Sequence, residues 1–356
     1  MLKCRDRDAP VSKEGIIFRV MGYDHPPGFC ICDVEYAPET IYKSYEKRAL
    51  RNGGRIKYYK FYFDGGLKFI YRNFPQYRTY SESFNTYFVG LHESQIGELR
   101  RPDKKLQEIF ESGRSDKLLT VLRNVLSEIL EISSLRLSDF GVFGSVLHDI
   151  YNVEYSDLDF IIYGRKQVEE LRKVLQSLYE DQGTGFRNEY GGSTPPDSRY
   201  KRFKHLTLKE YMRHQRRKLI YAVYDKAWRP IKLEFEPVRK WGEIKNTYPE
   251  IKRVKKLSMV EAIFEVRDAS QSYFMPSIYE IEILEAKNIP ESVKIDRIIS
   301  YVEEFRLQLE KGEYGIVKGW LEKIEKVSGE TRYQITLTYG PKYFEQVLKT
   351  INYFQK

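Results

Sequence analysis

Residues 141–145 read Gly-Val-Phe-Gly-Ser, and after eleven more residues the stretch 157–163 reads Asp-Leu-Asp-Phe-Ile-Ile-Tyr. An apolar run that ends in Gly144-Ser145 predicts a strand and then a turn. The N–H groups and hydroxyl of such a turn can cradle a phosphate if a helix begins there. Asp157 and Asp159 stand two apart at the head of a second apolar strand, so their carboxylates project from one face. Carboxylates placed in this way suit Mg²⁺ that is shared with substrate phosphates.

Together, Gly144-Ser145 and Asp157-Leu158-Asp159 at this spacing resemble the signature of the DNA polymerase beta-like nucleotidyltransferase superfamily, over about residues 116–240. The resemblance implies transfer of a nucleoside monophosphate from an NTP to an acceptor hydroxyl, with Mg²⁺ ions held by three carboxylates. Carried over by position, Gly144 and Ser145 would contact the triphosphate, and Asp157 and Asp159 would be catalytic metal ligands. We expect ATP binding, while the sequence leaves the transferred nucleotide open.

The third carboxylate of the superfamily lies on a later strand, which residues 230–236, Pro-Ile-Lys-Leu-Glu-Phe-Glu, predict here. Strand alternation puts Lys232, Glu234 and Glu236 on one face. The superfamily more often has Asp at this place, and the closest alignment puts Lys232 there. We predict Glu234 as the third catalytic carboxylate and metal ligand, with Glu236 as second choice. We interpret His148 as a surface or packing residue and not as a catalyst.

A basic segment follows the motif. The chain carries a net charge of +9, and residues 199–218 hold nine Lys and Arg against one acidic residue, Glu210. Thr207 and Glu210 form a capping-box pattern that predicts the start of a helix. On that helix Lys209, Arg213, Arg216 and Arg217 share a face, which could neutralise phosphates of a nucleic-acid acceptor, RNA most plausibly. The alternative is a solvated basic helix.

Two other groups of residues leave alternatives open. Residues 55–80 interleave Lys and Arg with Tyr and Phe, which suits a stacking platform for single strands, although we favour a core role for the aromatics. Cys4, Cys30, Cys32 and His25 could bind zinc, but Cys-x-Cys is not the usual ligand spacing. An odd number of cysteines is also a poor basis for a disulfide scaffold and favours a reducing cytoplasm.

The pattern along the chain predicts an α+β protein with three parts. Residues 1–98 read as a β-rich domain, with strands at 16–20 and 60–63 and turns at Asp24–Gly28, 52–54 and 64–66. Residues 99–240 read as the nucleotidyltransferase domain, a small mixed sheet with helices at 118–130, 167–179 and 207–219 and strands before Gly144 and at 158–163 and 230–238. Residues 241–356 read as five strands, which would suit a small barrel like an oligonucleotide-binding fold, and a last helix at 343–353.

The N-terminus carries charges where a secretory signal needs an apolar core, and no run approaches 18 apolar residues. We therefore expect a cytoplasmic protein with no membrane partner. Abundant Lys, Glu, Tyr and Ile resemble thermophile composition. Two functions besides transfer to RNA stay open: a noncatalytic nucleic-acid-binding protein with a degenerate transferase domain, and transfer to a protein or small-molecule hydroxyl. The sequence does not fix the oligomeric state.

Overall fold

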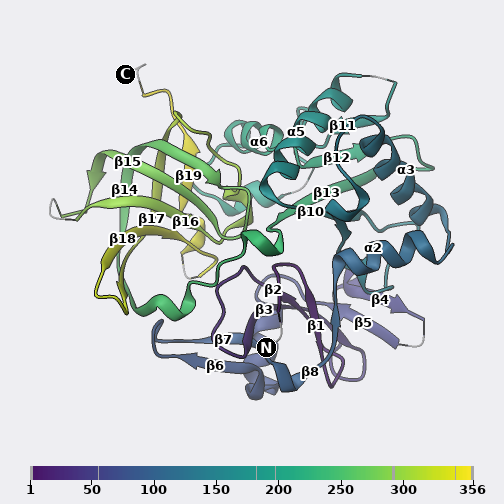
Figure 1. Ribbon diagram of the computed structural model, residues 1–356, viewed down its shortest axis with the longest axis horizontal. Coiled ribbons are helices and arrows are strands. Elements are labelled where there is room, and N and C mark those ends of the chain that lie inside the picture. Colours follow the sequence, from purple (N-terminus) through teal and green to yellow (C-terminus); the bar gives the residue numbers. More distant parts are fainter. Residues whose placement is uncertain are drawn as a thin grey trace. The chain divides into compact units, whose positions relative to one another are not determined.

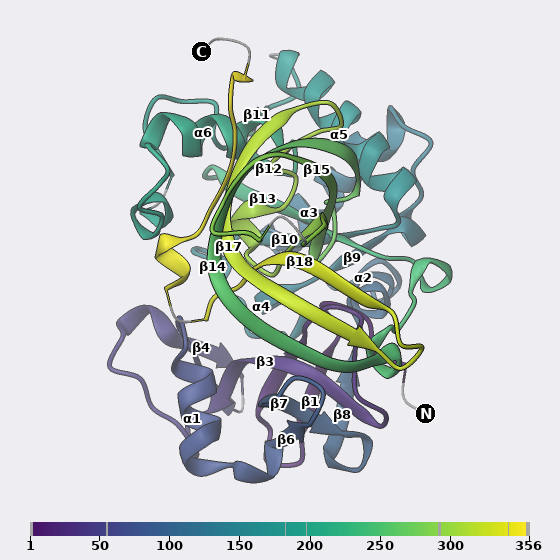
Figure 2. The same cartoon turned by 90° about the vertical axis from the view of Figure 1, so that its left-hand side faces the viewer.

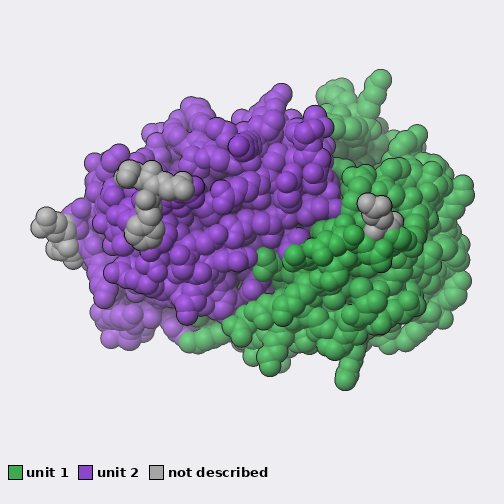
Figure 3. Space-filling model, turned by 90° about the horizontal axis from the view of Figure 1, so that it is seen from above, with its two compact units in different colours: residues 1–81, 85–187, 222–248 green, residues 82–84, 188–221, 249–356 purple. Residues whose placement is uncertain are grey.

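The computed structural model describes residues 3–54, 56–181, 183–196, 198–290, 293–340 and 342–353, so Arg55, at the start of the aromatic segment, lies outside them. Three sheets and several helices make a mixed α and β fold (Figure 1). The chain divides into two compact units, coloured separately in Figure 3. The first comprises residues 1–81, 85–187 and 222–248, and the second comprises residues 82–84, 188–221 and 249–356. Among the described residues, no helix has the length and apolar character needed to cross a membrane.

The first sheet is built by the N-terminal hundred residues. Its strands pair in the order β4-β5-β3-β2-β1-β8, and the hairpin of β6 and β7 joins it through β3. Their bounds are β1 (Ala9–Ser12), β2 (Ile17–Val20), β3 (Phe29–Pro38), β4 (Leu50–Gly53), β5 (Ile56–Lys60), β6 (Arg78–Ser81), β7 (Thr86–His92) and β8 (Ile96–Arg100). The prediction of a β-rich start is confirmed. The predicted strand at 60–63 is wrong, because β5 ends at Lys60 and Phe63 adopts a positive φ. Asp64 then caps helix α1 (Gly65–Asn73) where the sequence predicted only a turn.

The second sheet has the strand order β11-β12-β13-β10-β9. Its strands are β9 (Phe140–Val142), β10 (Leu158–Tyr163), β11 (Phe186–Asn188), β12 (Tyr221–Tyr224) and β13 (Ile231–Val238), and its helices are α2 (Pro102–Glu111), α3 (Lys117–Glu131), α4 (Gly144–Leu147) and α5 (Arg165–Glu180). Strand β10 runs parallel to β13 and antiparallel to β9, so the predicted mixed sheet is confirmed. Strands β11 and β12 were not predicted, because each is only three or four residues long.

Two buried clusters join the N-terminal strands to this second sheet within the first unit. In one, Ala9 of β1 packs with Phe143, Leu147 and Ile161. In the other, Ile150 packs among Val11, Ile17, Tyr36 and Tyr58. Burial of this much apolar surface stabilises the association. The segment that carries the Gly-Ser motif is therefore enclosed by side chains of both sheets.

The third sheet belongs to the second unit and closes on itself. Its strands are β14 (Ile251–Gln271), β15 (Ser277–Lys287), β16 (Ile295–Ser300), β17 (Tyr314–Lys326), β18 (Thr331–Leu337) and β19 (Val347–Thr350). They pair in the order β14-β15-β16-β18-β17, and β17 also pairs with β14, which completes a five-stranded barrel, whose curved strands are visible in Figure 2. Strands β16 and β18 run parallel, while the other pairs of the barrel are antiparallel.

The C-terminal end corrects one prediction. The predicted helix at 343–353 is wrong, because only Tyr343–Glu345 form a single 3₁₀ turn and Val347–Thr350 form β19. Strand β19 pairs antiparallel with β17, next to the barrel, and its Val347 and Leu348 are buried. Short apolar runs of this kind cannot be assigned to helix or strand by period alone. Pairing with the available edge of β17 decides the outcome.

Candidate active site

The acidic face of the second sheet lies across β10 and β13. Asp159 and Glu234 are register partners on these parallel strands, and the next partners on the same face are Ile161 and Glu236. Strands of one sheet lie about 4.8 Å apart, so the backbones of Asp159 and Glu234 are neighbours and their side chains leave the same face. Continued by one residue, the register sets Asp157 opposite Lys232. The sequence prediction that chose Glu234 as the companion of Asp159 matches this register.

The opposite face of β10 and β13 is buried in the apolar core, which fixes the position of both strands. Leu158, Phe160, Leu233 and Phe235 are at most 1% exposed, and the rings of Phe160 and Phe235 stack with centroids 5.0 Å apart. Alternation over residues 158–160 and 231–235 thus places these apolar side chains on one face and Asp159, Lys232 and Glu234 on the other. Further along the second face, Ile161 and Glu236 are buried.

Gly144 lies directly against Asp159. Its φ of +62° is a conformation that glycine adopts without strain, and a Cβ built on it would lie 2.1 Å from Oδ2 of Asp159. The backbone N–H of Phe143 also donates to the carbonyl oxygen of Asp159 over 2.7 Å. The structure therefore requires glycine at 144, because any side chain would displace the carboxylate of Asp159.

Ser145 connects the Gly-Ser turn to the residue before Asp157. Its hydroxyl lies 3.4 Å from Oγ of Ser156, which accepts the backbone N–H of Asn152 over 2.9 Å. Arg229 donates to the carbonyl oxygen of Ser156 over 2.6 Å. These contacts hold the two halves of the motif, eleven residues apart in sequence, in one local structure.

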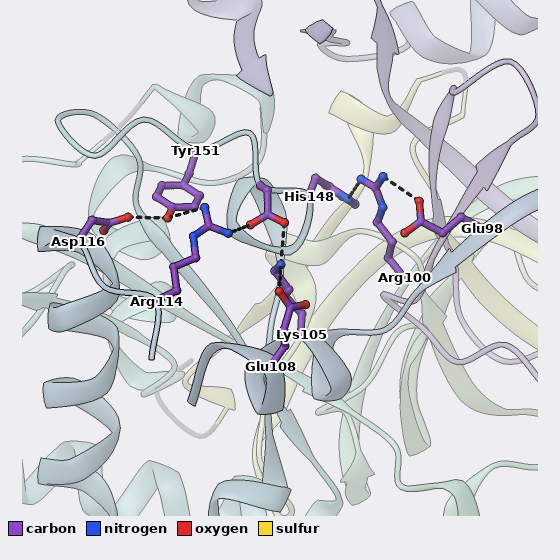
Figure 4. Close-up of polar contacts among 9 residues, drawn as sticks. Glu98, Arg100, Lys105, Glu108, Arg114, Asp116, His148 and Tyr151 are labelled. Atoms are coloured by element: carbon purple, nitrogen blue, oxygen red, sulfur yellow. Dashed lines mark hydrogen bonds and ion pairs between the residues drawn. The ribbon is translucent and has the colours of Figure 1, made fainter. Parts of the chain in front are cut away.

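The segment after the motif is held by charged side chains of α2 and of the loop before α3 (Figure 4). Lys105 and Arg114 each form an ion pair of 2.7 Å with Asp149, and the hydroxyl of Tyr151 donates to Asp116 over 2.6 Å. Asp116 is also the N-cap of α3, since its carboxylate accepts two backbone N–H groups. The network fixes the residues that follow α4 and so supports Gly144 and Ser145.

His148 is buried in the same segment. Its Nδ1 lies 3.3 Å from Nη1 of Arg100, and its ring packs edge-on against Tyr36 with centroids 5.7 Å apart. Burial, with Arg100 and Lys105 nearby, lowers the pKa of His148 to about 3. A ring that is neutral and enclosed in this way agrees with the prediction of a packing residue.

Asp159 is half-buried, and in the part of the chain that the structure describes its carboxylate accepts no hydrogen bond and forms no direct ion pair. Burial raises the pKa of Asp159 to about 6, opposed by Lys60 and reinforced by the carboxylates of Asp157, Glu236 and Glu35. A carboxylate that is buried among like charges and lacks a partner is costly to keep ionised. Such groups occur preferentially at functional sites.

Glu236, the second choice for the third carboxylate, has a different environment. It is 5% exposed and accepts a hydrogen bond of 2.8 Å from Nη2 of Arg7, which is 1% exposed. Arg7 belongs to the charged stretch Arg5-Asp6-Arg7-Asp8, whose four side chains are all buried. Glu236 is thus engaged in a buried ion pair with Arg7, whereas Glu234 is the register partner of Asp159.

The donor set suits Mg²⁺ in part. Carboxylate oxygens are its preferred protein ligands, and the lack of a side chain at Gly144 gives the carboxylate of Asp159 its place. Among the described residues, however, no group of three or more His, Cys, Asp or Glu side chains forms a ready-made metal site, so Asp157, Asp159 and Glu234 do not make a closed cage. Mg²⁺ usually takes one or two carboxylates and completes its shell with water and substrate phosphates. The residues fit that open kind of site.

The basic helix lies in the second unit as α6 (Leu208–Arg217), with the predicted capping box of Thr207 and Glu210. Its four predicted nucleic-acid contacts divide into two pairs. Arg216 donates to the carbonyl oxygens of Tyr190, Gly191 and Gly192, and Arg217 forms an ion pair of 2.9 Å with Glu313. Lys209 and Arg213 are exposed and make no hydrogen bond or ion pair with any described residue.

The cysteines lie in the N-terminal core. Cys4, Cys30 and Cys32 are all free and buried, and they pack in one apolar cluster. A hydrogen bond with Cys30 and burial raise the pKa of the Cys4 thiol. His25 accepts the N–H of Ile31 at its Nδ1 and lines a pocket of about 310 Å³ with Cys4 and Cys30. The structure thus places the three cysteines as packing residues of this apolar cluster.

The aromatic segment divides between core and surface, so the core role that we favoured holds for part of it. Tyr58, Phe61 and Tyr77 are buried, and Phe69 and Phe74 pack partly buried against the N-terminal core. Phe63, Tyr71 and Tyr80 are exposed. Lys60, between Tyr59 and Phe61, is half-buried and interacts electrostatically with Asp159. Sequence reasoning missed Lys60 and Arg7 as neighbours of the acidic face. The only signal was a set of charged residues inside or beside apolar strands, where charges need a structural or functional reason.

Comparison with other proteins gives one relative of full length. The chain is 26% identical over 350 residues to an uncharacterized protein of Methanocaldococcus jannaschii, a match that covers 98% of this chain and 99% of the relative. No protein-family model matches the chain, and no solved structure matches it. The similarity extends through both compact units and not only through the stretch from Gly144 to Asp159.

Proposed function

We propose that the protein is a Mg²⁺-dependent nucleotidyltransferase that transfers a nucleoside monophosphate from an NTP to an acceptor hydroxyl. The observation that carries the proposal is the pairing of Asp159 with Glu234 beside the Gly144 turn. The unpartnered carboxylate of Asp159 and the Gly-Ser/Asp-x-Asp spacing support it.

Each residue has a role in the proposed reaction. Asp157 and Asp159 would hold Mg²⁺, with Glu234 as third ligand, and the N–H groups and hydroxyl of Gly144-Ser145 would bind the triphosphate. Bound Mg²⁺ would neutralise phosphate charge and favour ionisation of the acceptor hydroxyl. Glu234 would accept a hydrogen bond from that hydroxyl and orient it toward the α-phosphorus. Holding the hydroxyl in line contributes much of the rate enhancement in phosphoryl transfer.

We infer that the acceptor is RNA. Residues 199–218 are strongly basic, and Lys209 and Arg213 on α6 have exposed cations that no described residue neutralises. The five-stranded barrel adds exposed Lys252, Arg253, Lys255 and Lys256 along β14. Binding through such cations releases counterions and weakens steeply as salt rises.

Transfer can be tested with α-labelled NTPs, Mg²⁺ and pooled RNA. We expect label in RNA with the wild-type protein and a loss of at least about 10³-fold with Asp159→Asn, since removal of one charge-stabilising group costs about this much. Asp225→Asn, which changes an exposed aspartate paired with Arg187, is the matched control and should retain activity. Equal labelling by Asp159→Asn and wild type would contradict the assignment. Label in added protein or small molecules, and not in RNA, would identify another acceptor.

A noncatalytic nucleic-acid-binding protein is the second candidate. The observation that favours it is the lack of a ready-made three-carboxylate group among the described residues, together with Lys232 opposite Asp157. Ligand binding stabilises a folded protein in proportion to occupancy. An intact site therefore predicts that NTP with Mg²⁺ raises the melting temperature, whereas RNA binding without that shift would favour the second candidate.

A further inference from the structure

Lys60 ends strand β5 of the N-terminal sheet and is the register partner of Tyr36 on β3. The side chain is half-buried, and its Nζ lies 5.9 Å from the centroid of the Tyr36 ring. Tyr36 in turn is 3% exposed and packs against His148, four residues after Gly144. These contacts place Lys60 beside the segment that follows the Gly-Ser turn.

The ammonium of Lys60 lies over the ring of Tyr36, and within the described residues it forms neither a hydrogen bond nor an ion pair. Lysines are seldom buried unless they are paired, because an ammonium loses much hydration energy. By contrast, Lys105 and Lys218, which are also buried, are fully engaged: Lys105 pairs with Asp149, and Lys218 donates to the carbonyl oxygen of Glu304. Lys60 is the exception among these three.

The electrostatic neighbours of Lys60 are the groups of the candidate site. Among charged groups, Lys60 has the largest effect on the pKa of Asp159, which it lowers. Lys60 also interacts with Glu35, which raises the pKa of Lys60, and with Arg51, which lowers it. Interaction with Tyr36, and then with Glu35 and Asp159, raises the pKa of Lys60 against the opposite effect of burial. Lys60 is therefore a cation at neutral pH that is close to Asp159 without contacting it.

We propose that Lys60 binds a terminal phosphate of the NTP, so that the N-terminal sheet supplies part of the active site. The role rests on the proposed function. A lysine ammonium is a compact point charge that suits phosphate oxygens. Cleavage leaves pyrophosphate with increased negative charge, so a cation at this position stabilises the leaving group more than the bound substrate.

The test compares nucleotide affinity with the number of phosphates. Dissociation constants for ATP, ADP, AMP and inorganic tripolyphosphate, each with Mg²⁺, are measured by calorimetry for wild type, Lys60→Met and Lys60→Arg. We expect Lys60→Met to weaken the binding of ATP and tripolyphosphate at least tenfold and the binding of AMP less than twofold. Lys60→Arg should recover part of the lost affinity. Lys57→Met, an exposed lysine on the same strand, is the matched control and should stay within twofold.

Four outcomes would overturn the proposal. Unchanged ATP affinity in Lys60→Met overturns it, and so does an equal loss for ATP and AMP, which would show a structural role. Circular dichroism establishes that each variant is folded, and if Lys60→Met is not, Lys60→Gln replaces it in the same series. Failure of the wild type to bind ATP, other NTPs or tripolyphosphate overturns the proposed function as well, whereas normal transfer by wild type and Lys60→Met alike overturns only the role of Lys60.

Discussion

Glu236 and Asp159 lie on neighbouring strands and point from the same face of one sheet, yet their environments are opposite. Glu236 is paired with the buried Arg7, whereas Asp159 accepts no hydrogen bond from any described residue and has a pKa raised to about 6 by burial. A buried charge that serves structure is neutralised by a partner. One that is left without a partner costs stability, and this cost is the mark of a group kept for binding or catalysis.

Removal of Glu236 is expected to have the largest effect on stability. In Glu236→Leu the guanidinium of Arg7 loses its 2.8 Å partner while it stays buried, which costs about 3–5 kcal/mol in comparable pairs. Thermal and denaturant unfolding of the variant measure the loss. Asp225→Asn, which removes a charge from an exposed pair, should cost at most about 1 kcal/mol. A loss in Glu236→Leu as small as that of the control would contradict the structural role of the pair.

The opposite change is expected at Asp159. Its folded-state pKa of about 6 lies above the ordinary value of 3.8, so the folded protein binds the proton more tightly than the unfolded chain does. Ionised Asp159 therefore lowers stability as pH rises from about 4 to 6, and the full penalty persists above pH 6. Asp159→Asn should raise stability at pH 8 by roughly 1–3 kcal/mol and leave it nearly unchanged at pH 4. Melting temperatures of wild type and Asp159→Asn at pH 4 and pH 8 test this prediction. A variant less stable than wild type at pH 8 would contradict it and show that Asp159 has a stabilising partner.

Gly144→Ala tests whether the turn is built around Asp159. The added Cβ would meet Oδ2 of Asp159, and the residue would have to keep a positive φ. We expect a loss of about 1–2 kcal/mol, typical of a non-glycine residue in this conformation, together with a loss of NTP affinity as Asp159 moves. Gly242→Ala, where a Cβ meets no atom within 4 Å, serves as the control. Unchanged stability and NTP affinity in Gly144→Ala would contradict the arrangement.

The smallest effect is expected on α6, where the same contrast between paired and unpaired charges recurs. Arg213 is exposed and pairs with no described residue, while Arg217 is paired with Glu313. If the helix contacts RNA, Arg213→Gln should reduce the slope of log affinity against log salt by about 0.7, which corresponds to one phosphate of a single strand. Arg217→Gln should change that slope less. Equal slopes for wild type and Arg213→Gln in filter-binding titrations would remove Arg213 from the interface.

Local patterns in the sequence predicted much of the fold. The apolar run at 158–163 predicted one strand, with Asp157 and Asp159 at its head, and alternation in residues 231–236 predicted the other and the face that carries Glu234. The stripe of α3 and the capping box of α6 were equally clear. The strands of the barrel were also predicted, although β14 proved to be 21 residues long. The helix predicted at 343–353 failed because its outcome depends on pairing with β17, which is distant in sequence.

The candidate site shows the same division between local and long-range information. Gly144, Ser145, Asp157 and Asp159 could be chosen because their spacing is local. Lys60 and Arg7 could not, because they reach the acidic face through packing of the N-terminal strands, around Ile150 and around Ala9. The contact between Arg7 and Glu236 depends on the tertiary fold, so no local or periodic pattern in the sequence predicts it.

The most direct test of the central claim is a crystal structure of the protein with Mn²⁺ in place of Mg²⁺ and a nonhydrolysable NTP, with the metal located by anomalous scattering. The account predicts an anomalous peak within about 2.0–2.5 Å of carboxylate oxygens of Asp157 and Asp159, with the triphosphate beside Gly144 and Ser145. A fully occupied nucleotide elsewhere, or no anomalous peak at these aspartates at saturating Mn²⁺ and NTP, would contradict it.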